Sequence, residues 1–111
     1  MAWLMRYPNE FWGTDPSIPV DVLDFGEPPF RKPKVKDVET SKYWELTAYD
    51  LFPDDVLHIG TKVFSEEHGV DARIAAVIFH DIDEKITWYG LDIDIDWADG
   101  AVPSNKLRVV P

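Results

Sequence analysis

Cysteine is absent from this 111-residue chain, and positive charge is scarce, with 11 Lys and Arg residues against 21 Asp and Glu residues. Without cysteine the chain has no disulfide, no thiol nucleophile and no thiolate metal site. No apolar stretch approaches the roughly 20 residues of a membrane-spanning helix, and the N-terminus lacks the pattern of a secretion signal. These absences predict a soluble protein of the cytoplasm.

The excess of acidic residues gives a net charge of −10. Such a charge repels nucleic acid and anionic membranes, and it attracts cationic partners. Up to Tyr49 the chain holds eight acidic and six basic residues, whereas from Asp50 onward it holds thirteen and five. The negative field is therefore expected to come from the C-terminal half.

The apolar content is high enough for a folded core, since 45% of the residues are hydrophobic and five are tryptophan. A chain of this length forms one domain and buries enough surface to fold without disulfides or metals. We therefore predict a single acidic β-rich domain over residues 1–111.

Residues 72–97, ARIAAVIFHDIDEKITWYGLDIDIDW, predict a β-hairpin with an acidic turn at 81–84. In the second strand, Asp92, Asp94 and Asp96 alternate with apolar residues. Side chains alternate between the faces of a strand, so the three carboxylates would form a row with a spacing of about 6.6–6.8 Å. The hairpin is expected to set the register of the whole sheet.

The apolar residues of this second strand change parity near Gly90. A glycine within a strand pattern is typical of a bulge or a bend. We predict a bulge at Gly90 that places Ile86 and Trp88 on the core face, together with the apolar residues that follow.

The predicted fold class is mainly β or α+β, with an antiparallel meander over about residues 43–97. Residues 53–68 leave two alternatives, because Pro53 followed by two acids is typical of a helix start, whereas the alternation over 57–63 is typical of a strand. At most one short helix is therefore expected there. Six of the nine prolines lie in 8–33, which predicts an irregular segment with an edge strand at 20–25. Residues 106–110 are expected to add a short edge strand.

No motif identifies an enzyme or a metal site. The acids at 92–99 resemble the start of an EF-hand loop, but Trp97 occupies the glycine position and Pro103 occupies the position of the closing glutamate. The three histidines show no ligand spacing, and the six glycines are scattered, so no phosphate-binding loop is present. We expect no cofactor, no metal and no enzymatic activity.

The sharpest functional feature is the row of acids beside large aromatic residues. Aromatic side chains are common interface anchors, and a carboxylate row complements a basic surface. We therefore expect an inhibitor module that occludes a basic protein partner, such as a nuclease or another nucleic-acid-handling protein, without binding nucleic acid or membrane itself. Small, acidic, cysteine-free chains rich in tryptophan are found among immunity proteins and nucleic-acid mimics, although no motif places this chain among them. The alternatives are a structural subunit of an assembly and a metal-dependent enzyme that uses the same acids.

The residues predicted to bind the partner are Asp81, Asp83, Glu84, Trp88, Asp92, Asp94, Asp96, Trp97 and Asp99.

Overall fold

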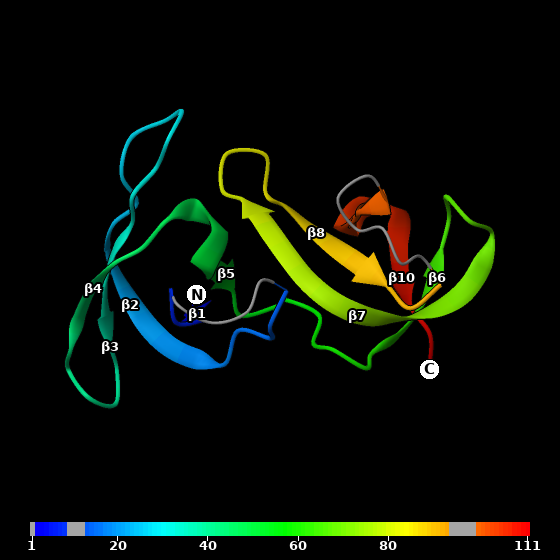
Figure 1. Cartoon of the computed structure of the whole chain (residues 1–111), viewed down its shortest axis with the longest axis horizontal. Coiled ribbons are helices and arrows are strands. Elements are labelled where there is room, and N and C mark those ends of the chain that lie inside the picture. The colour runs from blue at the N-terminus through cyan, green and yellow to red at the C-terminus, as the bar shows by residue number, and fades with distance from the viewer. Residues whose placement is uncertain (1, 9–12, 94–99) are drawn as a thin grey trace.

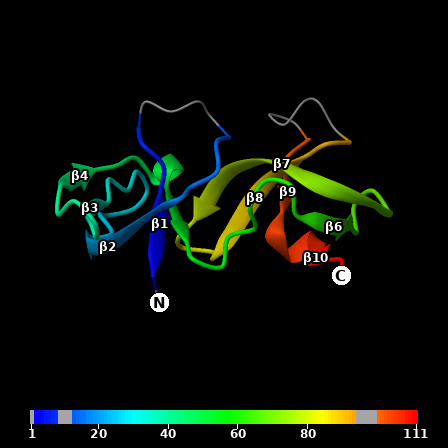
Figure 2. The same cartoon turned by 90° about the horizontal axis from the view of Figure 1, so that it is seen from below.

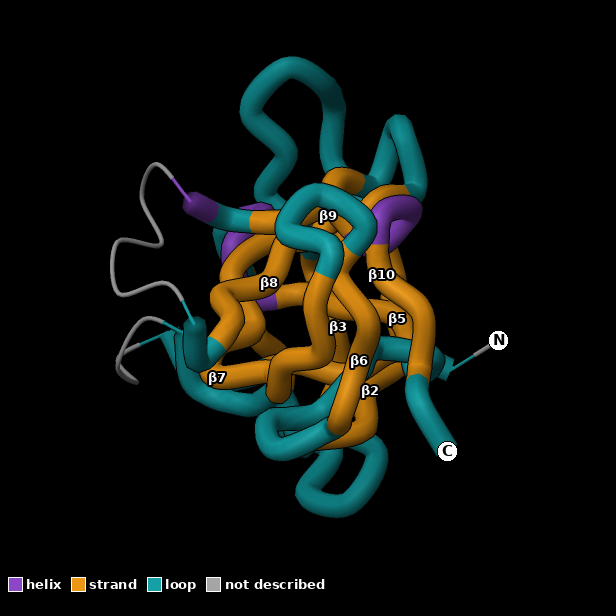
Figure 3. Tube along the Cα trace, turned by 90° about the vertical axis from the view of Figure 1, so that its right-hand side faces the viewer, coloured by secondary structure: helices purple, strands orange, loops and turns teal. Residues whose placement is uncertain are grey.

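The computed structural model describes residues 2–8, 13–93 and 100–111, which form two five-stranded antiparallel sheets lying next to each other (Figure 1 and Figure 2). The predicted mainly β class and antiparallel pairing are thereby confirmed. The helical elements with described bounds are two short 3₁₀ turns, η1 (Ala48–Asp50) and η2 (Ser104–Lys106), and Gly100 is also helical (Figure 3). Within the same residues, no helix is long and apolar enough to cross a membrane.

The first sheet has the strand order β4-β3-β2-β1-β5, so β1 lies between two strands that follow it in the chain. Its strands are β1 (Trp3–Met5), β2 (Ile18–Asp24), β3 (Lys34–Asp37), β4 (Tyr43–Glu45) and β5 (Leu51–Pro53). The strand predicted at 20–25 is therefore present, but it is an interior strand and not an edge, because β1 and β3 pair with its two sides. The segment 8–33 is thus less irregular than its prolines predict.

The second sheet has the order β10-β6-β7-β8-β9. Its strands are β6 (Lys62–Ser65), β7 (Val70–Asp81), β8 (Ile86–Leu91), β9 (Val102–Pro103) and β10 (Leu107–Val109). The hairpin predicted at 72–97 is the β7–β8 pair, and the predicted edge strand near the C-terminus is β10.

The meander predicted over 43–97 is confirmed only for β6, β7 and β8. Strands β4 and β5 also lie in this range, but they pair with β3 and β1 in the first sheet. No helix covers 53–68, where turns and loop over 54–61 lead into β6. The strand alternative for this range is correct for its last part alone.

Two buried clusters hold the sheets together, and β5 contributes to both. Leu51 packs with Met5 and Val35 in the first sheet, whereas Phe52 packs with Val77 and Tyr89 of the second. Neighbouring residues of a strand point to opposite faces, so this short strand joins the two clusters.

The bulge predicted at Gly90 lies on the partner strand. The β7–β8 register shifts between Ile74 and Ala76, which face Leu91 and Gly90, so the extra residue is Ala75. A second shift leaves Ile78 as the extra residue between Val77 and Phe79. Because β8 itself is regular, Thr87, Tyr89 and Leu91 form its buried face, and the prediction that Ile86 and Trp88 face the core is wrong.

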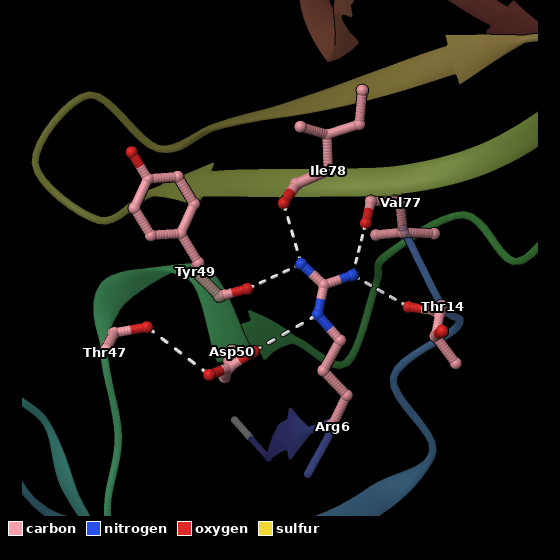
Figure 4. A network of polar contacts seen from close by, with 7 residues as sticks. All are labelled: Arg6, Thr14, Thr47, Tyr49, Asp50, Val77 and Ile78. Atoms are coloured by element: carbon pink, nitrogen blue, oxygen red, sulfur yellow. Dashed lines mark hydrogen bonds and ion pairs between the residues drawn. The ribbon is translucent and has the colours of Figure 1, made fainter. Parts of the chain in front are cut away.

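A buried arginine connects the two sheets at the second bulge (Figure 4). Arg6 is 2% exposed and follows β1. Its guanidinium donates to the carbonyls of Val77 and Ile78 in β7, and also to those of Thr14 and Tyr49. A bulge removes backbone groups from the strand ladder, and a guanidinium with five donors can satisfy several of them together.

The same guanidinium pairs with Asp50, at 3.4 Å between Nε and Oδ1, and lies 4.8 Å from the centre of the Phe52 ring. Arg6 thereby links β1, η1, β5 and β7.

Candidate functional site

The hairpin acids, Asp81, Asp83 and Glu84, lie at the turn between β7 and β8. The Oδ1 atom of Asp81 accepts hydrogen bonds from the backbone N–H groups of Asp83 and Glu84, at 3.0 and 3.1 Å. Asp81 therefore shapes the turn that presents the other two, which are both exposed. This is the behaviour expected of an aspartate at the start of a turn.

Asp83 is engaged within the protein by Arg31, whose Nε and Nη2 atoms contact its two carboxylate oxygens. The hydrogen bond from Arg31 holds the pKa of Asp83 below its ordinary value. Arg31 belongs to the basic run at 31–36, so part of that run neutralises the protein's own acidic turn. Asp81 and Glu84 thus carry most of the net negative charge that remains on the hairpin acids.

The predicted row of strand carboxylates is not confirmed. Strand β8 ends at Leu91, and Asp92 lies in a turn, so the prediction that it belongs to a strand is wrong. Its backbone N–H donates to the Arg73 carbonyl at 3.0 Å, and its Oδ1 accepts from the Arg73 N–H at 3.0 Å. The reciprocal bonds fix the turn against β7. The remaining predicted residues, Asp94, Asp96, Trp97 and Asp99, lie outside the described residues.

Trp88 is half-buried and belongs to an outer aromatic patch formed by Tyr49, Phe79 and Trp88. Phe79 and Trp88 are paired across β7 and β8, which places them on one face of the sheet. The ring of Tyr49, a residue that is 56% exposed, lies 5.1 Å from the ring of Phe79.

Two acidic positions flank the outer aromatic patch. Asp81 has the same strand parity as Phe79 and so lies on the same face of β7. Asp92 follows the opposite end of β8. The structure thus joins large aromatic residues to acids at both ends, although in a different arrangement from the predicted row.

On the opposite face of the β7–β8 pair, a cavity of about 530 Å³ opens between the two sheets. We call it the inter-sheet cavity. Trp3 and Pro53 line it from the first sheet, and His80, Thr87 and Leu107 line it from the second. Its walls are mainly apolar and aromatic, which is typical of small-molecule sites.

His80 and Thr87 are buried polar residues of the inter-sheet cavity, each at 5% exposure. The Nδ1 atom of His80 is 2.8 Å from Thr87 Oγ1, and the His80 ring lies edge-on to Trp3 with 5.8 Å between the ring centres. Burial lowers the pKa of His80, although Asp55 and Asp81 oppose the shift. The imidazole is therefore neutral at pH 7.

Tyr89 also lines the inter-sheet cavity. Its hydroxyl oxygen accepts the Leu57 N–H at 2.8 Å, and burial raises the pKa of the phenol. Tyr89 is thus a neutral structural contact between β8 and the 54–61 loop.

The other histidines do not form a site with His80. His58 pairs with Asp15 at 3.1 Å, and His68 lies 2.9 Å from the Ser65 hydroxyl in the β6–β7 turn. Within residues 2–8, 13–93 and 100–111, no three His, Asp or Glu side chains are close enough to hold a metal ion.

Comparison with known proteins gives no relative: no family model, curated protein or solved structure matches the chain.

Sequence reasoning missed two features, the inter-sheet cavity and the roles of Tyr49 and Phe79. Both depend on contacts between residues far apart in the chain. The one signal in the sequence was the presence of polar residues, His80 and Thr87, at positions that alternate with the outward Phe79 and Trp88.

Proposed function

We propose that this protein is an acidic binding module that occludes a positively charged surface of a nucleic-acid-handling protein. The observation that supports it best is the outer aromatic patch, Tyr49, Phe79 and Trp88, with acids at both ends of β8. Protein interfaces combine a central aromatic region with a polar rim, and Trp and Tyr are frequent hot spots. The proposed partner-binding face is therefore the outer face of β7 and β8.

The charge of the protein determines the kind of partner. With a net charge of −10, long-range attraction acts on basic surfaces and speeds their association with this protein. Of the basic residues at 31–36, Arg31 pairs with Asp83 at the β7–β8 turn, whereas Lys34 and Lys36 belong to β3 of the first sheet. A protein that binds nucleic acid carries the basic surface that such a module would cover.

The hairpin acids differ in how available their carboxylates are to a partner. Glu84 is exposed, and Asp81 shapes the turn by accepting backbone N–H groups, whereas Asp83 is already paired with Arg31. We therefore propose Asp81 and Glu84, with Asp92 at the other end of β8, as the charges that meet the partner. We also propose that the protein acts in the cytoplasm, where proteins rarely rely on disulfides and a chain without cysteine is at no disadvantage.

The test compares two variants with equal changes of charge. Asp81→Asn with Glu84→Gln removes two charges beside the outer aromatic patch, and Asn at 81 keeps the oxygen that caps the turn. Glu66→Gln with Glu67→Gln removes two charges from the β6–β7 turn. Each variant and the wild type are used to capture partners from the native cell, and the captured protein is then purified.

We expect the wild type and the Glu66/Glu67 variant to bind the purified partner equally, and the Asp81/Glu84 variant to bind at least about tenfold more weakly, as lost charge contacts predict. Binding should also weaken between about 50 and 200 mM salt, and the wild type should block the partner's access to nucleic acid. Equal binding by both variants, or binding without salt dependence, would refute the proposal. Self-association without a basic partner would favour a structural subunit, and saturable Mg²⁺ binding would favour a metal-dependent enzyme.

A further inference from the structure

We propose that the inter-sheet cavity binds a small uncharged molecule with an aromatic or alicyclic ring and one hydroxyl or amide group. This site is independent of the proposed protein-binding function, because it lies on the face of β7 and β8 opposite the outer aromatic patch. His80 and Thr87 point into it, whereas Phe79 and Trp88 have the other strand parity.

The size and walls of the inter-sheet cavity fit a ring-bearing molecule. Its volume of about 530 Å³ lies within the range of about 300–1,000 Å³ that small-molecule sites have. Trp3 and Phe25 meet edge-to-face with 5.2 Å between their ring centres, and both line the cavity with Ile82 and Leu107. Trp3 and Leu107 belong to strands of the two sheets, whereas Phe25 follows β2 and Ile82 lies in the β7–β8 turn. A ligand would therefore contact apolar surface on several sides.

His80 supplies the polar contact. It is 5% exposed, and its Nδ1 atom is already bonded to Thr87. Across the described ranges 2–8, 13–93 and 100–111, no hydrogen bond to its Nε2 atom is present. Nε2 is not among the fully buried side-chain atoms that lack a partner, so it keeps accessible surface through which a ligand can reach it. A hydroxyl or an amide can both donate and accept, so either group can pair with Nε2 in either neutral tautomer of the ring.

The charged residues at the rim of the inter-sheet cavity favour an uncharged ligand. Asp55 and Lys85 both line the cavity and are both exposed, and their opposite charges offset each other. The imidazole below them is neutral at pH 7, and Asp81 faces the other side of β7. An ionic ligand would lose its hydration on entry without gaining a complementary charge, which is costly in an apolar site.

Two probes of nearly equal shape test the proposal: 2-naphthol, which carries a hydroxyl, and 2-methylnaphthalene, which carries a methyl group in its place. Each is titrated into ¹⁵N-labelled full-length protein, and the imidazole nitrogens of His80 are followed by NMR. We expect 2-naphthol to shift the Nε2 resonance and to bind about fivefold more tightly than 2-methylnaphthalene, the gain that one net hydrogen bond gives. In His80→Phe, which keeps an aromatic ring, the two probes should bind equally.

Two tryptophan variants locate the probe. Val109 is 59% exposed and lines the cavity, so Val109→Trp fills the mouth without disturbing a buried contact and should weaken binding at least tenfold. Val38, at 55% exposure in the first sheet's β3–β4 turn, lies outside the lining, so Val38→Trp should leave binding unchanged. The proposal is overturned if the two probes bind the wild type equally, if Nε2 does not shift, or if Val109→Trp binds as the wild type does.

Discussion

Replacing Arg6 with methionine should strongly destabilise the fold, because the guanidinium is the donor for backbone carbonyls at the second β7 bulge. The substitution keeps much of the aliphatic chain but removes every donor. The carbonyls of Val77 and Ile78 lose a partner at buried positions, and Asp50, at 14% exposure, loses its cation. An unsatisfied buried group costs about 1–3 kcal/mol, and breaking a buried ion pair by removing one partner costs about 3–5 kcal/mol.

These costs overlap, because the same guanidinium makes all of the contacts, and Asp50 also accepts a hydrogen bond from the Thr47 hydroxyl at 3.3 Å. We therefore expect a loss of about 3–5 kcal/mol, a large part of the roughly 5–15 kcal/mol that stabilises a domain of this size. Urea unfolding followed by tryptophan fluorescence measures the loss. At typical urea slopes of about 1–3 kcal/mol per M, the midpoint should fall by about 1 M or more.

Arg31→Met is the matched control, because it breaks the exposed pair with Asp83 and should change stability little. Arg6→Lys retains the charge but cannot reach carbonyls in several directions, so it should fall between the wild type and Arg6→Met. If Arg6→Met has no folded baseline, the lysine variant provides the measurement. A loss below about 1 kcal/mol in both Arg6 variants would refute the reasoning, since it would mean that water replaces the guanidinium at the bulge.

Three further predictions concern titration and charge. The pKa of His80 in the folded protein lies below 6.5, so the unfolded chain takes up a proton on this ring first as the pH falls. The free energy of unfolding should therefore decrease as the pH drops from about 6.5 toward the folded pKa. In His80→Gln this part of the pH dependence should be absent. Asp37 accepts hydrogen bonds from the backbone N–H groups of Thr40 and Glu39, which lower its pKa. The stability that the Asp37 carboxylate contributes is present above pH 3.8 and is lost as the pH falls through the folded pKa. The difference in unfolding free energy between wild type and Asp37→Asn should therefore disappear in acid. Replacing Asp92, Asp94 and Asp96 together with asparagine should weaken partner binding far more than it reduces the urea midpoint, and capture of the same partners by both proteins would mean that these acids have no binding role.

The β7–β8 hairpin could be predicted because its signals are local. A long run of β-branched and apolar residues precedes Asp81, whose side chain is suited to a turn, and a second strand follows. The same reasoning located β10. Such features can be predicted without knowing which strands pair with each other.

The division into two sheets could not be predicted, because it depends on distant pairing. Strand β5 is only three residues long, and its partner is β1, nearly fifty residues earlier in the chain. A short alternating segment carries information about its faces but none about its neighbour. The predicted meander therefore assigned β4 and β5 to the wrong sheet.

The predicted orientation of β8 was wrong because the prediction used only the hydrophobicity of its residues. Thr87 faces inward because its hydroxyl bonds the His80 ring, while the larger Trp88 faces outward. A satisfied polar pair can occupy buried positions that the pattern assigns to apolar residues. The strand prediction at Asp92 failed for a related reason, since bonds to the Arg73 backbone favour a turn there.

The place of β1 in the first sheet has a consequence for the order of folding. This strand pairs with β2 on one side and with β5 on the other, so the earliest strand of the chain acquires its second neighbour only when residues 51–53 are available. During synthesis on a ribosome, the first sheet would stay open until then, and the Arg6 contacts to β7 would wait for residues 77 and 78. Chains dominated by such distant pairing fold in milliseconds to seconds, more slowly than helical bundles of equal size. Assembly of this protein is thus expected to be a late, nearly concerted event and not a sequential one.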